Sequence, residues 1–488
     1  MFCLLLSWLS GFAIQSASAE SIIIGSKKFT EAYVLAEIAK HSLGAAGIPA
    51  EHRQGMGGTI ILWQALRANQ VTVYPEYTGT IAEEILKNPG ASEDMMRSEL
   101  AKSGVAMSPE LGFNNTYALV MRRDAASAAG IRTISDLRAH PELKFGLTHE
   151  FLDRRDGWQP LAARYGLSSR SLKGIDHGLG YEALRNRSID VKDAYSTDAK
   201  IGEYDLITLE DDLHFFPQYK AVFLYRNSLG AEARHAIETI AGTIDEARMI
   251  RLNAEAERTK NYARAAELYF RETGQTVAGF SDESFTQKLA RWTGRHLELA
   301  GFSLLLAMMV GVPLGIVASR GGAIGHVILG FTSLVQTIPS LALLALLVPL
   351  PFFGISARTA IAALFLYGLL PIVRNTATGL QDISPPLRES AIALGLPPFA
   401  RLRRIYLPMA SRTILAGIKT SAVINIGTAT LAALIGAGGL GEPIISGLNL
   451  NDHRTILQGA IPAALLALLV QWLFDLLDRF LIPKGLRL

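Results

Sequence analysis

The segment ESAIALGLPPFARLRRIYLP, residues 389–408, is a short basic stretch with three arginines inside some of the most apolar sequence of the chain. Two runs on either side of it, AGFSLLLAMMVGVPLGIVAS (300–319) and TILQGAIPAALLALLVQWLF (455–474), contain no charged residue. Each run is long enough to cross about 30 Å of hydrocarbon as a helix. The sequence therefore predicts a membrane domain in which residues 389–408 form a loop.

The whole C-terminal part, residues 281–488, is predicted to be an all-α polytopic membrane domain with five transmembrane helices. A buried soluble helix bundle is the alternative, but the uncharged runs favour a membrane, as does an apolar content of 49% in the chain as a whole. The predicted spans cover approximately residues 297–319, 325–350, 357–379, 409–432 and 455–481.

The charges indicate how these spans are oriented. From Gly301 onward there are 13 basic and 6 acidic residues, whereas the rest of the chain has 34 and 38. If the N-terminal part is exported, five crossings place Arg320, the 374–412 loop and the C-terminus with Lys484 and Arg487 in the cytoplasm, where basic residues accumulate. The sequence thus predicts a multi-pass protein of the bacterial inner membrane, and arginines that flank the spans instead of forming one patch argue against nucleic-acid binding.

Residues 1–19 are predicted to be a signal peptide or an uncleaved N-terminal anchor. They form an apolar run that ends in Ala17-Ser18-Ala19, the small-x-small pattern of a cleavage site, although no Lys or Arg precedes it. Either reading leaves residue 20 onward outside the cytoplasm. Cys3 is the single cysteine, so a cleaved chain has no disulfide to form.

Residues 20–280 are predicted to form a soluble, extracytoplasmic α/β domain of two lobes. Short β-rich runs alternate with helical segments, which indicates mainly parallel sheets with crossover helices. A domain of this size usually divides in two. The β-rich runs are SIIIGS (21–26), VTVYPEY (71–77), TYALVMR (116–122), KFGLTH (144–149), VKDAYST (191–197) and AVFLYR (221–226).

The first predicted helix opens directly after the first predicted strand, in SKKFTEAYVLAEIAKHSL (26–43). Thr30 is expected to cap it, and its apolar face comprises Val34, Leu35, Ile38 and Leu43. The positive end of this helix, with Lys27 and Lys28, then faces the sheet edge at which anions bind in open α/β folds. GMGGT (55–59) repeats the arrangement, although a glycine turn alone is more often a simple chain reversal.

The loop quoted first fits the pattern E-x-A-x-x-x-G, followed after nine intervening residues by I-x-L-P, which resembles the EAA loop of ABC importer permeases. The resemblance implies a coupling loop, residues 385–408, that docks on a separate cytoplasmic ATPase. An amphipathic surface helix would explain the arginines alone. The residues that match the motif are Glu389, Ala391, Gly395, Ile405, Leu407 and Pro408.

ATP-binding equipment is not expected in this chain, because the dipeptide Gly-Lys of a P-loop does not occur in it. ATP and Mg²⁺ are therefore assigned to the partner ATPase. GAGGLG (436–441) fits G-x-G-x-x-G, but the topology places it outside with no βαβ unit after it. We interpret it as a flexible or re-entrant loop. No metal-ligand cluster and no catalytic Ser/His/Asp set stands out, so an enzyme is not predicted.

The exported domain resembles binding proteins for glycine betaine, choline and carnitine through GSKKFTE, YPEYTGT, NNTYALVM, DAYSTD and FFPQY. HLELAGFSLLLAMMVGVPLGI, TIPSLALLALL and LLPIVRNTATGL likewise resemble the permease of the same osmoprotectant importers. The chain is thus similar to a binding protein fused ahead of its permease, and a homodimer is implied. In the family, tyrosines of these motifs surround a quaternary ammonium; here they are Tyr77, Tyr117, Tyr195 and Tyr219.

The chemistry of the expected ligand agrees with such an aromatic box, because a trimethylammonium group donates no hydrogen bond and is best held by ring faces. Lys27 and Lys28 beside a helix N-terminus suit a carboxylate, with Thr80 and Thr59 as further donors. This favours glycine betaine, carnitine or proline betaine over choline. An importer of another amine or amino acid, and a membrane-bound osmolyte sensor, are the alternatives.

Overall fold

The computed structural model describes residues 21–167, 171–275, 284–350, 352–449 and 452–481. They form two compact units, one ending at Ser281 and one that comprises Asp282–Leu448 and Asp452–Leu488, and each unit is described by itself. The predicted signal segment, 1–19, lies outside the described residues, as do Lys484 and Arg487.

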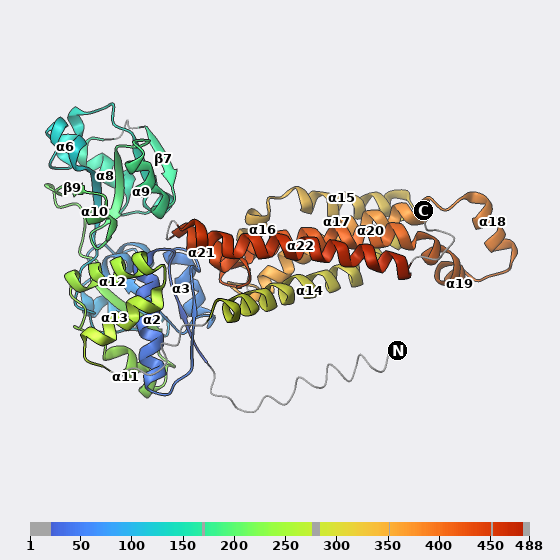
Figure 1. The fold of residues 1–488 in the computed structure, drawn as a ribbon, viewed down its shortest axis with the longest axis horizontal. Helices are drawn as coiled ribbons and strands as arrows, with labels where there is room; N and C mark the ends of the chain where they lie inside the picture. The colour runs from blue at the N-terminus through green and yellow to red at the C-terminus, as the bar shows by residue number, and fades with distance from the viewer. Residues whose placement is uncertain (1–20, 168–170, 276–283, 351, 450–451, 482–488) are drawn as a thin grey trace. The chain divides into compact units, whose positions relative to one another are not determined.

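The first unit contains two five-stranded sheets, and each sheet is the centre of one lobe (Figure 1). The first sheet has the order β2-β1-β3-β10-β4, with β1 Ile22–Gly25, β2 Ala50–Arg53, β3 Val73–Tyr77, β4 Val105–Met107 and β10 Ala221–Arg226. The second has the order β7-β6-β8-β5-β9, with β5 Tyr117–Arg122, β6 Phe145–Thr148, β7 Leu172–Ile175, β8 Val191–Tyr195 and β9 Leu206–Thr208.

All six predicted strands are present, and the sheets are mainly parallel as predicted, with one reversed strand in each. In each sheet the strand that follows a crossing between the lobes is antiparallel to both neighbours: β10 to β3 and β4, and β5 to β8 and β9. Because the crossing chain arrives at the edge where β3 and β8 end, it can only continue away from that edge. Ala221 accordingly pairs with Tyr77, and Tyr117 with Tyr195.

Helices cover both sheets. Those of the first lobe are α2 Thr30–Ala45, α3 Thr59–Arg67, α4 Thr78–Thr80 with a π-helical turn Ile81–Ile85, α5 Glu93–Lys102, α11 Ala231–Glu238, α12 Glu246–Thr259 and α13 Tyr262–Glu272. Those of the second lobe are α6 Arg123–Ala129, the 3₁₀ segment Ser135–Ala139, α7 His149–Asp153, α8 Trp158–Tyr165, α9 His177–Arg185 and α10 Lys200–Glu203.

Helix α2 buries the predicted face, since Val34, Leu35, Ile38 and Leu43 are inaccessible to solvent. Thr30 does not cap it: the N-cap residue is Phe29, and no side chain accepts a bond from the first turn. The strand-to-helix turn is one residue shorter than predicted, so Thr30 already has helical geometry.

The second unit is entirely helical. It consists of α14 Phe285–Ala318, α15 Gly322–Thr337, α16 Ser340–Leu347, α17 Ala357–Gln381, α18 Pro385–Ala393, α19 Pro398–Arg401 with a π-helical turn Leu402–Tyr406, α20 Leu407–Ala429 with a 3₁₀ turn Thr430–Ile435, α21 Gly441–Asn449 and α22 His453–Leu481.

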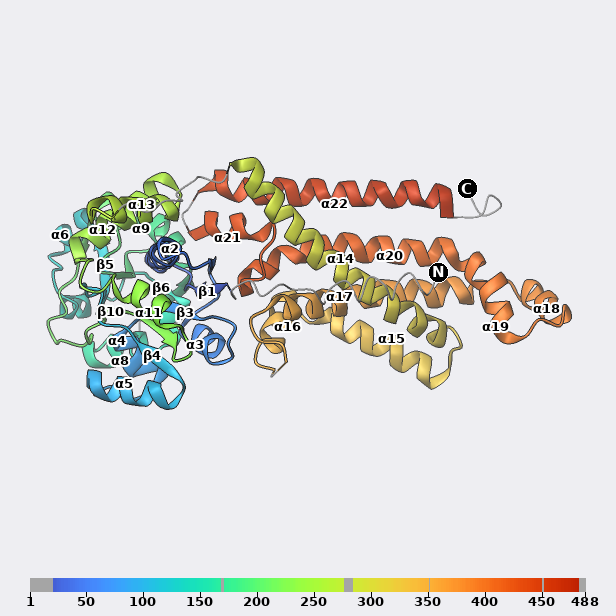
Figure 2. The same cartoon turned by 90° about the horizontal axis from the view of Figure 1, so that it is seen from below.

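The long helices of this unit run side by side, with α14 against α17, α17 against α20, and α20 against α22 (Figures 1 and 2). Glycines allow the close approach: a Cβ on Gly315 would lie 2.5 Å from Thr376, and one on Gly368 would lie 2.5 Å from the hydroxyl of Ser421. In both views α18 and α19 lie beyond one end of the bundle, and α16 and α21 lie at the other.

The second predicted span is not one helix. Within the described residues four helices are long and apolar enough to cross a membrane, and α15 with α16 adds a fifth only as a pair bent by 98°. Pro339 forces the preceding Ile338 into an extended conformation, which ends α15. The hydroxyl of Tyr367 on α17 donates to the carbonyl of Ile338 and holds the break.

The GAGGLG loop is buried, which argues against the flexible loop of our interpretation, whereas the re-entrant loop stays a prediction. Residues 437–441 are buried, and a Cβ on Gly441 would lie only 1.9 Å from the carbonyl oxygen of Thr430. The imidazole of His296 on α14 accepts a bond from the amide of Leu440. The glycines therefore serve close packing at the end of the bundle, and α21 follows at once.

Candidate binding site

The four predicted tyrosines lie at the edges of the two sheets that face each other. Tyr77 ends β3, Tyr195 ends β8, Tyr117 begins β5, and Tyr219 stands two residues before β10. All four line one pocket between the lobes, and three of them are at least 95% buried. The antiparallel strands produce this convergence, because they bring strand beginnings and strand ends to the same edge.

The rings form a connected cluster. The ring of Tyr117 lies 5.1 Å from that of Tyr195 and 5.6 Å from that of Tyr219, centroid to centroid. Phe29 completes the cluster, 4.9 Å from Tyr195 and 6.3 Å from Tyr77. Burial raises the pKa of all four phenols above the ordinary tyrosine value, so the rings remain neutral at physiological pH.

The two predicted lysines have different positions. Lys27 lines the pocket, but its ammonium is buried in an ion pair with Glu76 on β3. Lys28 is exposed on part of its surface and is not a lining residue. Burial lowers its pKa, and the carboxylate of Asp176 in the second lobe opposes that shift. Only Lys27 is therefore placed to contact a ligand directly.

A second cation, Arg154, lines the pocket and was not predicted. Its guanidinium lies 5.3 Å from the ring centre of Tyr117 and is buried against Asp156. One of its nitrogens donates to the hydroxyl of Thr80 over 3.3 Å, and another lies 3.7 Å from Glu150. Arg154 follows α7, and α7 begins directly after β6. Its position shortly after a predicted strand, at the edge of the sheet, is the sequence feature that could have predicted it.

The two predicted threonines also differ. Thr80 lines the pocket, whereas Thr59 lies outside it and contacts Glu150 of the second lobe at 3.4 Å. Thr59 therefore joins the lobes and does not reach the pocket. The lining residues that the sequence did not single out are Phe29, Asn115, Glu150 and Arg154.

The predicted coupling residues lie at the α18–α19 end of the helical unit. Glu389 is exposed on α18, and Ala391 on the same helix is buried. Gly395 forms the turn to α19 with φ of 66°. The remaining motif residues continue into α20, with Ile405 in the π-helical turn and Leu407 and Pro408 in the first turn of the helix.

This end also carries an exposed apolar surface, formed by Ile392, Leu394 and Phe399, which we call the apolar tip. Their exposed fractions are 57%, 72% and 72%. Such exposure beside a motif residue marks an interaction surface. No sequence pattern had indicated a role for these three residues.

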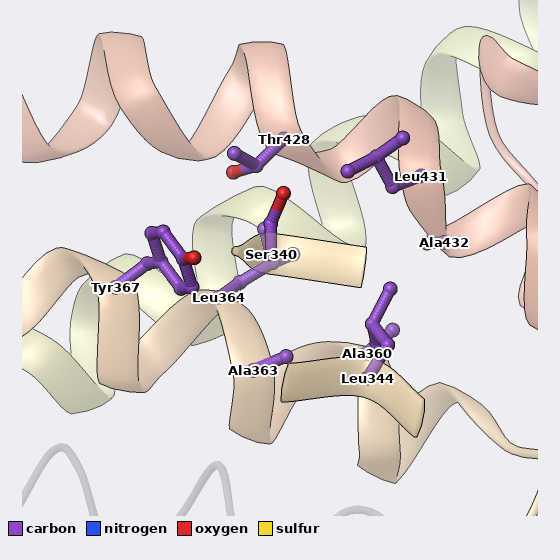
Figure 3. Close-up of a pocket in the computed structure, with 9 residues that line it drawn as sticks. All are labelled: Ser340, Leu344, Ala360, Ala363, Leu364, Tyr367, Thr428, Leu431 and Ala432. Atoms are coloured by element: carbon purple, nitrogen blue, oxygen red, sulfur yellow. The ribbon is translucent and has the colours of Figure 1, made fainter. Parts of the chain in front are cut away.

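A second pocket lies in the helical unit, where α16 meets α17 and α20 (Figure 3). The side chains of Ser340, Tyr367 and Thr428 bring three hydroxyls to it, and the rest of its lining is aliphatic. The hydroxyl of Thr428 already donates to the carbonyl of Ile424 in its own helix. The hydroxyls of Thr428 and Tyr367 thus already have backbone partners, and we assign this pocket no ligand.

A two-lobed α/β domain with an aromatic pocket, joined to a bundle of membrane-spanning helices, defines a solute-binding protein fused to a membrane transporter part. Residues 20–272 match the family described as the substrate-binding domain of ABC-type glycine betaine transport systems. Residues 311–483 match the binding-protein-dependent transport system inner membrane component. The chain belongs to the glycine betaine substrate-binding family, with a permease domain in the same polypeptide.

Parts of the chain are similar to several known proteins. The chain is 43% identical over 202 residues to the osmoprotectant import permease protein OsmW of Salmonella typhimurium, which covers 41% of this chain and 94% of that protein. It is 41% identical over 195 residues to the glycine betaine/carnitine/choline permease OpuCB of Bacillus subtilis, covering 40% and 89%. A crystal structure of a glycine betaine/carnitine/choline ABC transporter matches 52% of this chain and 99% of its own, with 27% identity and a TM-score of 0.45.

The chain is therefore the fused binding and permease subunit of an osmoprotectant ABC importer, and a multi-pass protein of the inner membrane.

Proposed function

We propose that this importer takes up quaternary-ammonium compatible solutes, glycine betaine foremost, and also carnitine, proline betaine or choline. The observation that carries the proposal is the convergence of Tyr77, Tyr117, Tyr195 and Tyr219 on one pocket. Each ring face contributes about 0.5–2 kcal/mol to holding a cation that cannot donate hydrogen bonds.

A carboxylate on the same solute has donors in the same pocket. Lys27, Arg154 and Thr80 supply an ammonium, a guanidinium and a hydroxyl. Arginine can bind a planar carboxylate in a bidentate way, and Arg154 already contacts Asp156 in this manner. These donors support a zwitterion, and this is why we place glycine betaine ahead of choline.

One observation favours choline as a second candidate. Glu150 also lines the pocket, and both pocket cations already have carboxylate partners, Glu76 for Lys27 and Asp156 for Arg154. A ligand without its own carboxylate avoids repulsion by Glu150. Glycine betaine and choline would both enter the same aromatic box. A comparison of their affinities is therefore needed to distinguish them.

The test is titration calorimetry on the full chain in lipid nanodiscs, with glycine betaine, proline betaine, carnitine, choline and, as a control without a quaternary nitrogen, glycine. We expect glycine betaine to bind more tightly than choline and glycine not to bind. Tighter binding of choline would overturn the carboxylate argument. Binding of glycine alone would replace the proposed solute with an amino acid.

We further propose that two copies of this chain form the pathway and that two cytoplasmic ATPase subunits drive it, one on each coupling loop 385–408. ATP and Mg²⁺ would then be bound by those subunits. The binding domain would face the periplasm, and the C-terminus the cytoplasm. The exposed apolar tip supports a partner at this loop. The test is solute uptake into proteoliposomes that contain the chain, with and without the ATPase. Uptake that depends on the ATPase would exclude the alternative that the protein is a sensor that does not transport its solute.

A further inference from the structure

The carboxylate of Glu31 lies behind the aromatic box and is bonded from several directions. Glu31 stands in the first turn of α2 and is 98% buried. Four neutral side-chain donors reach its two oxygens. They are the hydroxyl of Tyr77 at 2.6 Å and the amide of Asn115 at 2.8 Å on Oε1, and the hydroxyl of Thr197 at 2.5 Å and the amide of Asn253 at 3.2 Å on Oε2.

These donors connect the two lobes through one side chain. Tyr77 belongs to the first lobe, whereas Thr197 follows β8 of the second lobe, and Asn115 lies on the chain segment that crosses between them. Asn253 on α12 bonds both Glu31 and the carbonyl of Thr197, 3.0 Å away. Two of the donors, Tyr77 and Asn115, also line the ligand pocket.

We propose that Glu31 is a positioning residue for solute binding. Its carboxylate fixes the ring of Tyr77 in the aromatic box and, through the hydroxyl of Thr197, holds the second lobe against the first. We call this set of hydrogen bonds to Glu31 the latch. This inference rests on the proposed function, because it assigns Glu31 a part in holding the closed pocket around the solute. Glu31 itself is not among the lining residues.

The hydrogen-bond pattern selects the ionised form of Glu31. An ionised carboxylate only accepts bonds, and here each oxygen accepts two. A protonated carboxyl must donate one proton, which displaces a donor. Among the described residues the side-chain oxygens of Asn115 and Asn253 have no partner, since both amides direct their nitrogens at Glu31. The latch is therefore complete only when Glu31 is charged.

The surroundings place this ionisation near neutrality. Burial raises the pKa of Glu31 to about 7, the bonds from Thr197, Tyr77 and Asn253 oppose that shift, and the charge of Asp198 adds to it. On β3, Glu76 is paired with Lys27, and on α12 the acids that follow Asn253 are Glu255, which pairs with Arg258, and Glu257. Since the pKa is raised, acidification through about pH 7 protonates Glu31 and removes one acceptor, so solute affinity should fall as the pH falls.

The experiment compares the full chain in nanodiscs with its E31Q variant, using glycine betaine as the probe between pH 6 and pH 8.5. Loss of charged hydrogen bonds should weaken binding by E31Q about tenfold at pH 8.5. The parent should lose affinity on acidification, whereas E31Q should give a flat profile. E257Q is the matched control, because burial raises the pKa of Glu257 to about 7 as well, and it should keep the parental profile.

A second pair of variants tests the cross-lobe bond without changing Glu31. T197V removes the hydroxyl donor and should weaken binding, whereas T197S retains it and should restore the parental value. Equal affinities and pH profiles for the parent, E31Q and T197V would overturn the inference.

If the parent binds none of glycine betaine, proline betaine, carnitine and choline at any pH, the proposed function fails on its own. The hydrogen bonds of the latch are then tested by measuring amide hydrogen exchange in residues 195–199. T197V should accelerate this exchange, whereas T197S should not. Unchanged exchange in both variants would overturn the latch as well.

Discussion

At the residue scale, the four tyrosines of the box are not equivalent. The hydroxyl of Tyr77 donates to Glu31, and that of Tyr219 donates to Asp156 at 2.7 Å. Tyr117 and Tyr195 contact each other through their rings and hydroxyls, and neither hydroxyl donates to a carboxylate among the described hydrogen bonds. Replacing each by alanine removes a ring face, whereas replacing each by phenylalanine removes only the hydroxyl.

The first prediction follows from that difference. Each Tyr→Ala change should weaken glycine betaine by about 1–2 kcal/mol, roughly ten- to thirtyfold. Y117F and Y195F should stay close to the parent, because the ring face is retained. Y77F and Y219F should lose several-fold more affinity, since each leaves a buried carboxylate short of one donor. Calorimetry on the full chain measures all eight variants, and parental affinity in all four alanine variants would exclude the box.

The second prediction concerns the Lys27–Glu76 pair. Burial raises the pKa of Glu76 and the charge of Lys27 opposes it, so K27Q leaves an uncompensated acid. Breaking a buried pair in this way costs about 3–5 kcal/mol of stability. The double variant K27Q/E76Q should recover most of the stability without recovering betaine affinity, and its preference for betaine over choline should narrow.

Lys28 provides the control, because it does not line the pocket. K28Q should keep both the melting temperature and the betaine preference. If K28Q loses the preference for betaine over choline and K27Q/E76Q keeps it, then Lys28 and not Lys27 binds the carboxylate of the solute.

At the scale of elements, the sequence predicted the strands and helices that depend on a local residue pattern. It did not predict the features that depend on contacts between distant segments of the chain. The runs at 71–77 and 191–197 both contain Val, Thr and Tyr, residues that favour strands. Their antiparallel neighbours follow from the chain's two crossings between the lobes, which no local pattern encodes. Likewise, hydropathy predicts one span over 325–350, but Pro339 divides it into α15 and α16.

The coupling loop gives the third prediction. A Cβ on Gly395 would meet nothing within 4 Å, so the glycine is required here for its φ of 66° and not for close packing within this chain. G395V should abolish uptake, because a β-branched residue in this conformation is strained by about 1–2 kcal/mol or more. G395N should retain uptake, since asparagine adopts the left-handed region.

Uptake into proteoliposomes and betaine binding are measured on the same variants. Binding should be equal in G395V, G395N and the parent, because the pocket lies in the other unit. Loss of uptake in both variants would show that a side chain at this position blocks docking, whatever the backbone conformation.

The fourth prediction concerns the apolar tip of the same loop. L394D and F399D place a charge on side chains that are 72% exposed, so the fold should tolerate both. If the ATPase covers this surface, both variants should lose ATPase co-purification and uptake. L305D is the control, because Leu305 on α14 is also an exposed apolar residue but lies outside the apolar tip. If the L305D chain inserts into the membrane, it should bind the ATPase as the parent does. ATPase binding by L394D and F399D at the parental level would exclude the tip from the interface.

At the scale of the whole molecule, the sequence identified both parts because each carries several motif residues in a fixed order. It found the tyrosines of the site but not Arg154 or Glu150. Those two side chains belong to a helical segment without a quoted motif, and only the fold brings them to the edge of β3 and β8. Their part in the site depends on the way the lobes meet, which a motif in one segment does not specify.

The last prediction tests the orientation of the membrane part, and the bend between α15 and α16 makes the test decisive. If α15 and α16 together cross the membrane once, five spans place Gly321 and Ala400 in the cytoplasm and Gly354 outside. If the bent pair instead returns to the side from which it entered, Gly354 lies with Gly321, and Ala400 is exposed outside. Single cysteines at these positions, in a C3S background, are labelled in intact cells with a membrane-impermeant maleimide. We expect labelling at position 354 alone, because the basic loop around Ala400 belongs on the cytoplasmic side. Labelling at position 400 would contradict both the five-span topology and the coupling role of the loop, since an ATPase cannot reach a segment outside the membrane.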